Sequence, residues 1–274
     1  MRQAFIFKDP SLSLIQIIDA LLFASKETKI SSPNYGEWLW GSSASYCLEK
    51  WLKSQKIPTG ANICCPAYIC DSVVAPFIYS GIEVRFYNLN DDLTPDMNNV
   101  LALTDRYTRA WIGVNYFGFP TMTDEFISEG RRRNILIIED NAHGWFSCNR
   151  TIQLGFRGDI GIFSPRKTYP LPDGGCMWIR DSTNTATVSP ISGENASIGE
   201  NPFRFLMKRL IWNLEERSGI PLYKFLRKRR VQSAERCRQK IKEKREIFSF
   251  HGGKMSSILL KLFNVLNKNN SIIT

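Results

Sequence analysis

The sequence predicts an α/β protein built around a mainly parallel sheet. Short apolar runs recur from residue 62 to residue 179, and segments with helical spacing of apolar residues lie between several of them. Strands that are apolar throughout are typical of a sheet covered by helices on both faces. The chain has 274 residues, of which 43% are hydrophobic and 12% aromatic, so it can bury such a core. Disorder is therefore not the expected state of this chain.

The first elements of the sheet domain are expected just after residue 41. Apolar residues recur at helical spacing over 44–52, directly after Ser42 and Ser43, so a helix is expected to begin there. The two serines are small polar residues of the kind that cap a helix N-terminus. The run Asn62–Pro66 is apolar and short, which predicts a buried strand.

A second helix and a half-buried strand are expected next. Asp71 is expected to cap a helix that continues through Tyr79, and Gly81 is expected to end it. From Ile82 to Tyr87 apolar residues alternate with charged or polar ones. This alternation predicts a strand in which Ile82, Val84 and Phe86 point inward.

The remaining apolar runs continue the α/β pattern. One further helix is predicted over 124–132. Strands are predicted at 100–103, 110–114, 135–138, 160–163 and 177–179.

Outside residues 41–180 the composition changes, and the whole chain is expected to divide into four segments. Residues 12–24 form an apolar stretch interrupted by Asp19, too short to span a bilayer, and predict an amphipathic helix. Residues 181–202 are rich in Ser, Thr, Asn and Gly, as linkers are. The expected organisation is an N-terminal helical segment at 1–40, a large domain at 41–180, a linker at 181–202, and a basic helical segment at 203–274 that begins an incomplete small domain.

The charge and the cysteines restrict the function classes. Residues 204–246 hold 15 Lys or Arg against 5 Asp or Glu, which equals the +10 net charge of the whole chain. Such a tail could bind nucleic acid or anionic lipid, but no recognition motif accompanies it, and a solvated helix face is the simpler interpretation. Seven cysteines and two histidines offer no zinc-ligand spacing, so buried, reduced thiols, a cytoplasmic location and no metal are expected.

The most specific chemical pattern joins three motifs. Ile137–His143 reads IIEDNAH, Gly158–Lys167 reads GDIGIFSPRK, and Asp173–Gly175 reads DGG. The first two place a carboxylate and an amine after separate buried strands, at the carboxyl edge where α/β sheets bind ligands. Pyridoxal phosphate needs an amine to form a Schiff base and an acid to keep its pyridine nitrogen protonated.

These motifs resemble the DegT/DnrJ/EryC1/StrS family of sugar aminotransferases, which have the aspartate-aminotransferase-like fold type I of PLP-dependent transferases. The resemblance covers residues 42–175. It implies that Lys167 forms the Schiff base, Asp140 pairs with the pyridine nitrogen and His143 approaches the ring hydroxyl. It further implies phosphate contacts from Ser164 and from the helix start at Ser42 and Ser43. Tyr68 is a candidate for stacking on the ring, because Cys70 stands where relatives often place an aromatic residue.

Each of these residues also has a purely structural interpretation. Lys167 could be a solvated loop lysine, Asp140 a turn cap, and His143 a packed histidine. Only two residues separate Ser164 from Lys167, whereas the family usually has four, so the loop between them must be rebuilt.

The resemblance implies an aminotransferase of a nucleotide-linked keto sugar, with an amino-acid donor and a homodimeric assembly. The alternative is a truncated, catalytically inactive binding or remnant protein, because relatives continue for about another hundred residues into a small domain.

Overall fold

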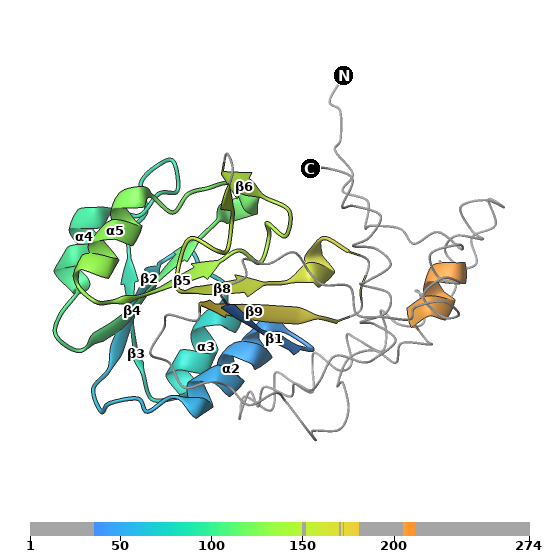
Figure 1. The fold of residues 1–274 in the computed structure, drawn as a ribbon, viewed down its shortest axis with the longest axis horizontal. Helices are drawn as coiled ribbons and strands as arrows, with labels where there is room; N and C mark the ends of the chain where they lie inside the picture. Colours follow the sequence, from blue (N-terminus) through green and yellow to red (C-terminus); the bar gives the residue numbers. More distant parts are fainter. Residues whose placement is uncertain (1–35, 150–151, 170, 172, 181–204, 212–274) are drawn as a thin grey trace, which may run out of the picture. The chain divides into compact units, whose positions relative to one another are not determined.

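The computed structural model describes residues 36–149, 152–169, 171, 173–180 and 205–211. A seven-stranded sheet has the order β1-β9-β8-β5-β4-β2-β3 (Figure 1). Its strands are β1 (Gly36–Gly41), β2 (Asn62–Pro66), β3 (Glu83–Tyr87), β4 (Thr108–Val114), β5 (Leu136–Asp140), β8 (Ile160–Phe163) and β9 (Gly175–Arg180). β9 runs antiparallel to both β1 and β8, and the other neighbouring pairs are parallel. The predicted mainly parallel sheet is therefore confirmed.

Helices cover both faces of this sheet. They are α2 (Ala44–Ser54), α3 (Asp71–Tyr79), α4 (Met97–Leu103) and α5 (Asp124–Arg132), with 3-10 turns η1 (Tyr116–Gly118) and η2 (Pro165–Lys167). Figure 1 shows α2 and α3 together on one side of the sheet and α4 and α5 on the other. The short strands β6 (Cys148–Asn149) and β7 (Ile152–Gln153) pair separately. In the described part of the chain no helix has the length and hydropathy needed to span a bilayer.

Strands between two helix layers explain the continuous apolar runs. In β2, Ile63 and Cys65 belong to the core cluster under α2 and α3, whereas Cys64 belongs to the cluster under α4 and α5. In β5, Ile138 and Ile137 divide in the same way, and both are fully buried. Because successive side chains alternate between faces, a strand buried on both faces is apolar along most of its length, and its polar residues, such as Asn62 and Glu139, are hydrogen-bonded. Burying each such side chain contributes about 1.5–3 kcal/mol.

Aromatic rings attach the segment after β5 to the sheet. The Trp38 ring of β1 lies 5.3 Å from the Phe163 ring of β8, measured between centroids. Phe163 in turn contacts Trp145 at 5.5 Å and Phe156 at 5.2 Å. Trp145 and Phe156 come from the loop that follows β5, so this cluster fixes the loop against the strands.

The predicted strand at Val100–Leu103 is wrong, because these residues form the second half of α4. The Asp96 side chain caps the helix by accepting a hydrogen bond from Asn99 N at 3.3 Å. Val100 is fully buried among residues of β2, β3, β4 and β5 and of α5. A run of four apolar residues fits a helix facing the core as well as a strand.

The expected N-terminal helical segment at 1–40 is wrong at its end, because Gly36–Gly41 is strand β1 and pairs with β9. Residues 1–35 lie outside the described residues, as do the predicted linker at 181–202 and most of the basic segment at 203–274. Residues 205–211 form a helix, as expected for the start of that segment.

Two further details of the prediction need correction. Phe86 is 50% exposed while Tyr87 is fully buried and donates a hydrogen bond through its hydroxyl to Ile112 O at 2.7 Å. Tyr87 belongs to the core cluster under α4 and α5, whereas Val84 packs against the cluster on the other face, so β3 contributes apolar residues to both faces of the sheet. The N-cap of α3 is Cys70, and Asp71 lies in the first turn of the helix.

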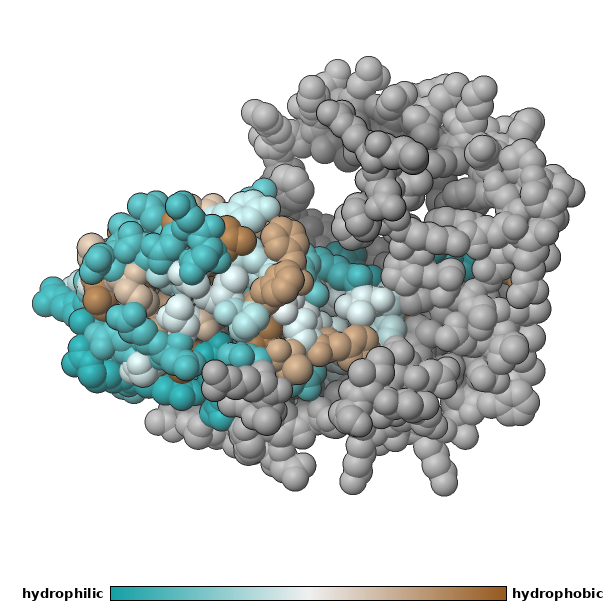
Figure 2. All heavy atoms as spheres, turned by 90° about the horizontal axis from the view of Figure 1, so that it is seen from above, coloured by the Kyte–Doolittle hydropathy of each residue, from teal (hydrophilic) through white to brown (hydrophobic). Residues whose placement is uncertain are grey.

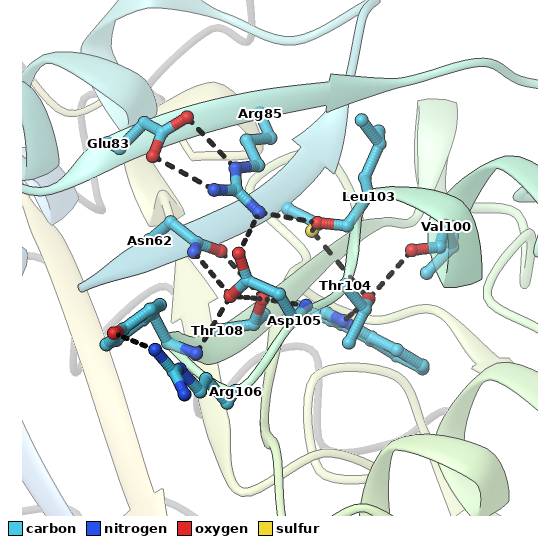
Figure 3. A network of polar contacts seen from close by, with 12 residues as sticks. Asn62, Glu83, Arg85, Val100, Leu103, Thr104, Asp105, Arg106 and Thr108 are labelled. Carbon is cyan, nitrogen blue, oxygen red and sulfur yellow. Dashed lines mark hydrogen bonds and ion pairs between the residues drawn. The ribbon is translucent and has the colours of Figure 1, made fainter. Parts of the chain in front are cut away.

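Polar side chains bind together the amino ends of β2, β3 and β4, away from the carboxyl edge (Figure 3). Asp105 accepts hydrogen bonds from Asn62 Nδ2 at 3.0 Å and from Arg85 Nη1 at 2.7 Å, and Arg85 also pairs with Glu83 at 2.9 Å. Thr108 Oγ1 donates to Asn62 Oδ1 at 2.7 Å. These hydrogen bonds hold the three strands in register at that edge.

Candidate active site

The predicted site residues described below all lie along one edge of the sheet, in or just after the ends of its strands. The carboxyl ends of β1, β2, β4, β5 and β8 meet there, together with the amino end of the antiparallel β9. Ser42 and Ser43 follow β1, Asp140 ends β5, and Ser164 follows β8. Tyr68 comes two residues after β2. The topology therefore brings together residues separated by more than a hundred positions in sequence.

Lys167 and His143 are in direct contact at this edge. Lys167 Nζ lies 2.9 Å from His143 Nε2. Partial desolvation of the ring is the largest effect that lowers the pKa of the His143 imidazole, although the residue as a whole is exposed. The positive charge of Lys167 adds to this effect, and Asp140 opposes both. This shift favours the neutral imidazole, and in the tautomer protonated at Nδ1 its Nε2 accepts a hydrogen bond from the lysine amine.

Asp140 is buried at the end of β5 and lies within electrostatic range of both residues. Its carboxylate accepts a hydrogen bond from Ala142 N at 3.0 Å. Burial raises the pKa of the Asp140 carboxyl, while the Ala142 N–H, Lys167 and His143 act in the opposite direction. A carboxylate that burial destabilises gains from a cationic partner, and a pyridinium nitrogen is such a partner.

Glu139, next to Asp140, lies on the opposite face of β5, as the strand alternation requires. It is fully buried and accepts hydrogen bonds from Asn115 Nδ2 at 2.8 Å, Arg157 N at 2.8 Å and Gly158 N at 3.2 Å. Three donors satisfy this carboxylate, so it fastens loops to the sheet.

The 3-10 turn η2 accounts for the short spacing between Ser164 and Lys167. Lys167 N donates to Ser164 O at 2.9 Å, and Pro165 occupies the first position of the turn. A 3-10 turn repeats every three residues, so Ser164 and Lys167 stand at the start and end of a single turn. Ser164 is buried and Lys167 is exposed. The predicted rebuilding of this loop takes the form of η2.

The N-terminus of α2 lies against the glycine pair. Ser43 is the N-cap, and its Oγ accepts from Tyr46 N at 3.2 Å. Gly174 N donates to Ser42 O at 2.8 Å. A Cβ on Gly175 would lie 1.9 Å from Ala44 N, so only glycine permits this approach. The glycine pair thus joins the Lys167 loop to a helix N-terminus, which attracts anions such as phosphate.

Tyr68 lies at the same edge but is 61% exposed. Its ring stacks on Tyr116 with the centroids 5.4 Å apart, and Tyr116 Oη donates to Tyr68 O at 2.6 Å. Cys70 is exposed, with Sγ 3.0 Å from Ser72 Oγ, so the expectation of buried cysteines fails here and at Cys148. Among the described residues, no group of three or more His, Cys, Asp or Glu side chains could hold a metal ion.

Two residues at this edge were not predicted as site residues. Asn141 is fully buried and donates through Nδ2 to Gly144 O at 2.7 Å and Leu154 O at 2.9 Å, which shapes the loop that carries His143. Asp173 is buried, and neither carboxylate oxygen has a hydrogen-bond partner. Burial raises the pKa of Asp173 to about 6, and Arg166 partly offsets this effect. An aspartate in a proline-rich loop gives no sequence signal of burial.

The residues at this edge fit pyridoxal phosphate. They provide an accessible amine at Lys167, a buried carboxylate at Asp140 for the ring nitrogen, and a helix N-terminus after Ser42 for the phosphate.

Comparisons with known proteins agree with this fit. The model of the DegT/DnrJ/EryC1/StrS aminotransferase family matches residues 39–195. Protein MosB of Rhizobium meliloti is 31% identical over 161 residues, which cover 54% of this chain and 31% of MosB. GDP-4-keto-6-deoxy-D-mannose 3-dehydratase of Yersinia pseudotuberculosis is 25% identical over 130 residues, covering 46% and 33% of the two chains. The match spans about a third of the length of each of these relatives.

A solved structure supports the fold. DesI in the presence of its TDP-sugar product superimposes with a TM-score of 0.51 and 17% identity, covering 64% of this chain and 50% of DesI. The predicted fold of PLP-dependent transferases is confirmed by this likeness and by the sheet topology. Because the family match covers more than half of the 274 residues, the chain belongs to the DegT/DnrJ/EryC1/StrS aminotransferase family.

Proposed function

We propose that this chain forms the pyridoxal-phosphate site of an aminotransferase that acts on a nucleotide-linked keto sugar, with an amino acid as donor. The observation that carries the proposal is the contact of Lys167 Nζ with His143 Nε2 at 2.9 Å, beside the buried Asp140. The names of similar proteins, which refer to a GDP-linked keto sugar and to a TDP-sugar product, support the substrate class.

Each residue has a distinct task in this proposal. When bound, pyridoxal phosphate supplies an electron sink for the carbon next to the substrate nitrogen. Lys167 would hold the cofactor through Nζ, and its amine would move a proton at the substrate carbon. Asp140 would keep the ring nitrogen protonated by charge pairing. His143 contacts Lys167 Nζ and would hydrogen-bond to the ring hydroxyl of the cofactor.

The phosphate is assigned to the start of α2 and to Ser164. The backbone N–H groups at a helix N-terminus and the dipole of the helix both favour an anion. Ser42 and Ser43 lie at that start, and Ser164 begins the turn that ends in Lys167. Tyr68 remains a candidate for stacking on the cofactor ring, since its exposed ring stands at the same edge.

Reductive labelling tests the central assignment. The protein is incubated with pyridoxal phosphate, reduced with borohydride and mapped by peptide mass. The label is expected on Lys167, and Lys167→Arg should abolish it. Lys56→Arg is the matched control, because Lys56 is an exposed lysine near the opposite, amino edge of the sheet. In this variant Lys167 should be labelled as in the native protein. A label on another lysine, with Lys167 unmodified, would contradict the proposal.

A donor half-reaction separates the enzyme from a protein that only binds the cofactor. An active site should convert bound pyridoxal phosphate to the amine form when glutamate is added, which changes its visible absorbance. Labelling of Lys167 without this conversion would support the alternative of an inactive binding protein.

A homodimer belongs to the same proposal. Tyr68 and Phe146 are 61% and 49% exposed in loops that follow β2 and β5. Figure 2 shows apolar surface among hydrophilic residues on the described part of the chain. A two-fold partner would bury such rings in a self-complementary way. The free thiols of the described cysteines support a cytoplasmic location.

A further inference from the structure

Phe117 combines a rare backbone conformation with a rare exposure. Its φ of 55° and ψ of 18° lie in the left-handed region, which a bulky residue seldom adopts. Its side chain is 65% exposed, so core packing does not hold the residue in this state. A strained residue beside a ligand site is a reason to look for a function.

The turn that contains Phe117 is fixed from both sides. Phe119 N donates to Tyr116 O at 2.9 Å, and Tyr116 Oη donates to Tyr68 O at 2.6 Å. Gly118, with φ +83°, lies so close to the loop after β5 that a Cβ would stand 2.4 Å from Ser147 Oγ. The close approach of these two loops determines where the Phe117 ring lies.

The Phe117 ring lies beside the imidazole of His143 in an offset, nearly parallel arrangement. The ring centroids are 6.1 Å apart and the planes differ by 14°, so the two rings are nearly parallel. The same imidazole contacts Lys167 Nζ through Nε2 at 2.9 Å. His143 is exposed on the loop, and the other charged groups that act on it are Asp140 and Lys167. The contact with the Phe117 ring therefore restrains the rotation of the exposed His143 side chain.

We propose that Phe117 is a positioning residue: the left-handed turn holds its ring against the side of the His143 imidazole, which keeps Nε2 directed at the amine of Lys167. The proposal rests on the proposed function only in taking Lys167 as the reactive amine. It explains why a strained phenylalanine stands at an exposed position, where a glycine would adopt the same backbone conformation without strain.

Titration of the histidines by NMR tests this role without any cofactor. The chain has two histidines, so His143→Gln assigns the resonances and His251 serves as an internal reference. In Phe117→Gly the pKa of His143 should rise toward its ordinary value, because the ring no longer shields the imidazole from water. The melting temperature should stay constant or rise, since glycine relieves the backbone strain. Phe117→Tyr should restore the titration of the native protein.

Phe119→Ala is the matched control, since Phe119 is 67% exposed in the same turn. It should leave the titration of His143 unchanged. An unchanged pKa of His143 in Phe117→Gly would overturn the proposal, and so would equal shifts in Phe117→Gly and Phe119→Ala. If Phe117→Gly does not fold, Phe117→Ala provides the same comparison. Because the titration needs no cofactor, it stands apart from the borohydride experiment, whose failure would overturn the proposed function alone.

Discussion

Gly175→Ala should damage the fold and the site together, because the added methyl group meets backbone atoms. The new Cβ would lie 1.9 Å from Ala44 N and 2.3 Å from Ser43 C. Ordinary contact begins near 3.4 Å, so β9 or the start of α2 must move by about 1.5 Å. Forced backbone shifts of this kind destabilise by about 1–3 kcal/mol, occasionally more, and we expect about 3 kcal/mol here. A displacement near 1 Å also reduces catalysis by roughly a hundredfold.

Urea unfolding followed by tryptophan fluorescence measures the change. A loss of about 3 kcal/mol lowers the urea midpoint by about 1 M or more. Gly60→Ala is the control, because Gly60 also has no Cβ but has open space around it, with φ +77° and nothing within 4 Å. Gly60→Ala should lower the free energy of unfolding by about 1 kcal/mol only, the cost of a left-handed backbone at alanine. If Gly175→Ala unfolds at the same urea concentration as Gly60→Ala, the argument from close approach is refuted.

Three further predictions concern electrostatics and assembly. Asp140→Asn should retain the fold, judged by circular dichroism, but lose turnover by about a hundredfold or more in a transamination assay, because an amide cannot stabilise a pyridinium charge. Burial raises the pKa of Asp173 to about 6 from 3.8, so the folded state binds the proton more tightly and the unfolding free energy falls as pH rises through that window. Asp173→Asn should therefore be more stable than the native protein above pH 6 in urea titrations, and equal or lower stability there would contradict the assignment. Light scattering should give twice the 31.4 kDa chain mass, and a monomer that transaminates would refute the shared site.

The sequence predicts the buried strands well, because their apolar character follows from burial on both faces. Asn62–Pro66 and the helix over 124–132 match the structure to the residue. The predicted strand at 100–103 is wrong because a run of four apolar residues fits a buried helix as well as a strand. β1 is missed for a related reason: it lies at the sheet edge and pairs with β9, which is more than a hundred residues away.

The candidate site, like the fold, could be predicted from the sequence only in part. Asp140, Ser164 and Lys167 could be placed at one edge, since strand ends fix that position and the family motif gives the order. The contact between Lys167 and His143 depends on a 3-10 turn and on loop geometry that no periodicity encodes. Asp173 and Phe117 were not recognised, because burial of a loop carboxylate and a left-handed φ are set by tertiary contacts.

The ion pairs on β3 affect whether another chain can add a strand to this edge of the sheet. β3 is an edge strand, and an edge with unpaired N–H and C=O groups can template strands from other chains. Glu83 and Arg85 place charge along this edge, and Asp105 ties Arg85 down from the adjoining loop. A foreign strand that docked there would have to strip water from these charges, which opposes sheet extension. The network shown in Figure 3 thus places charges at the edge strand, next to the exposed Phe86, where they oppose the addition of a further strand.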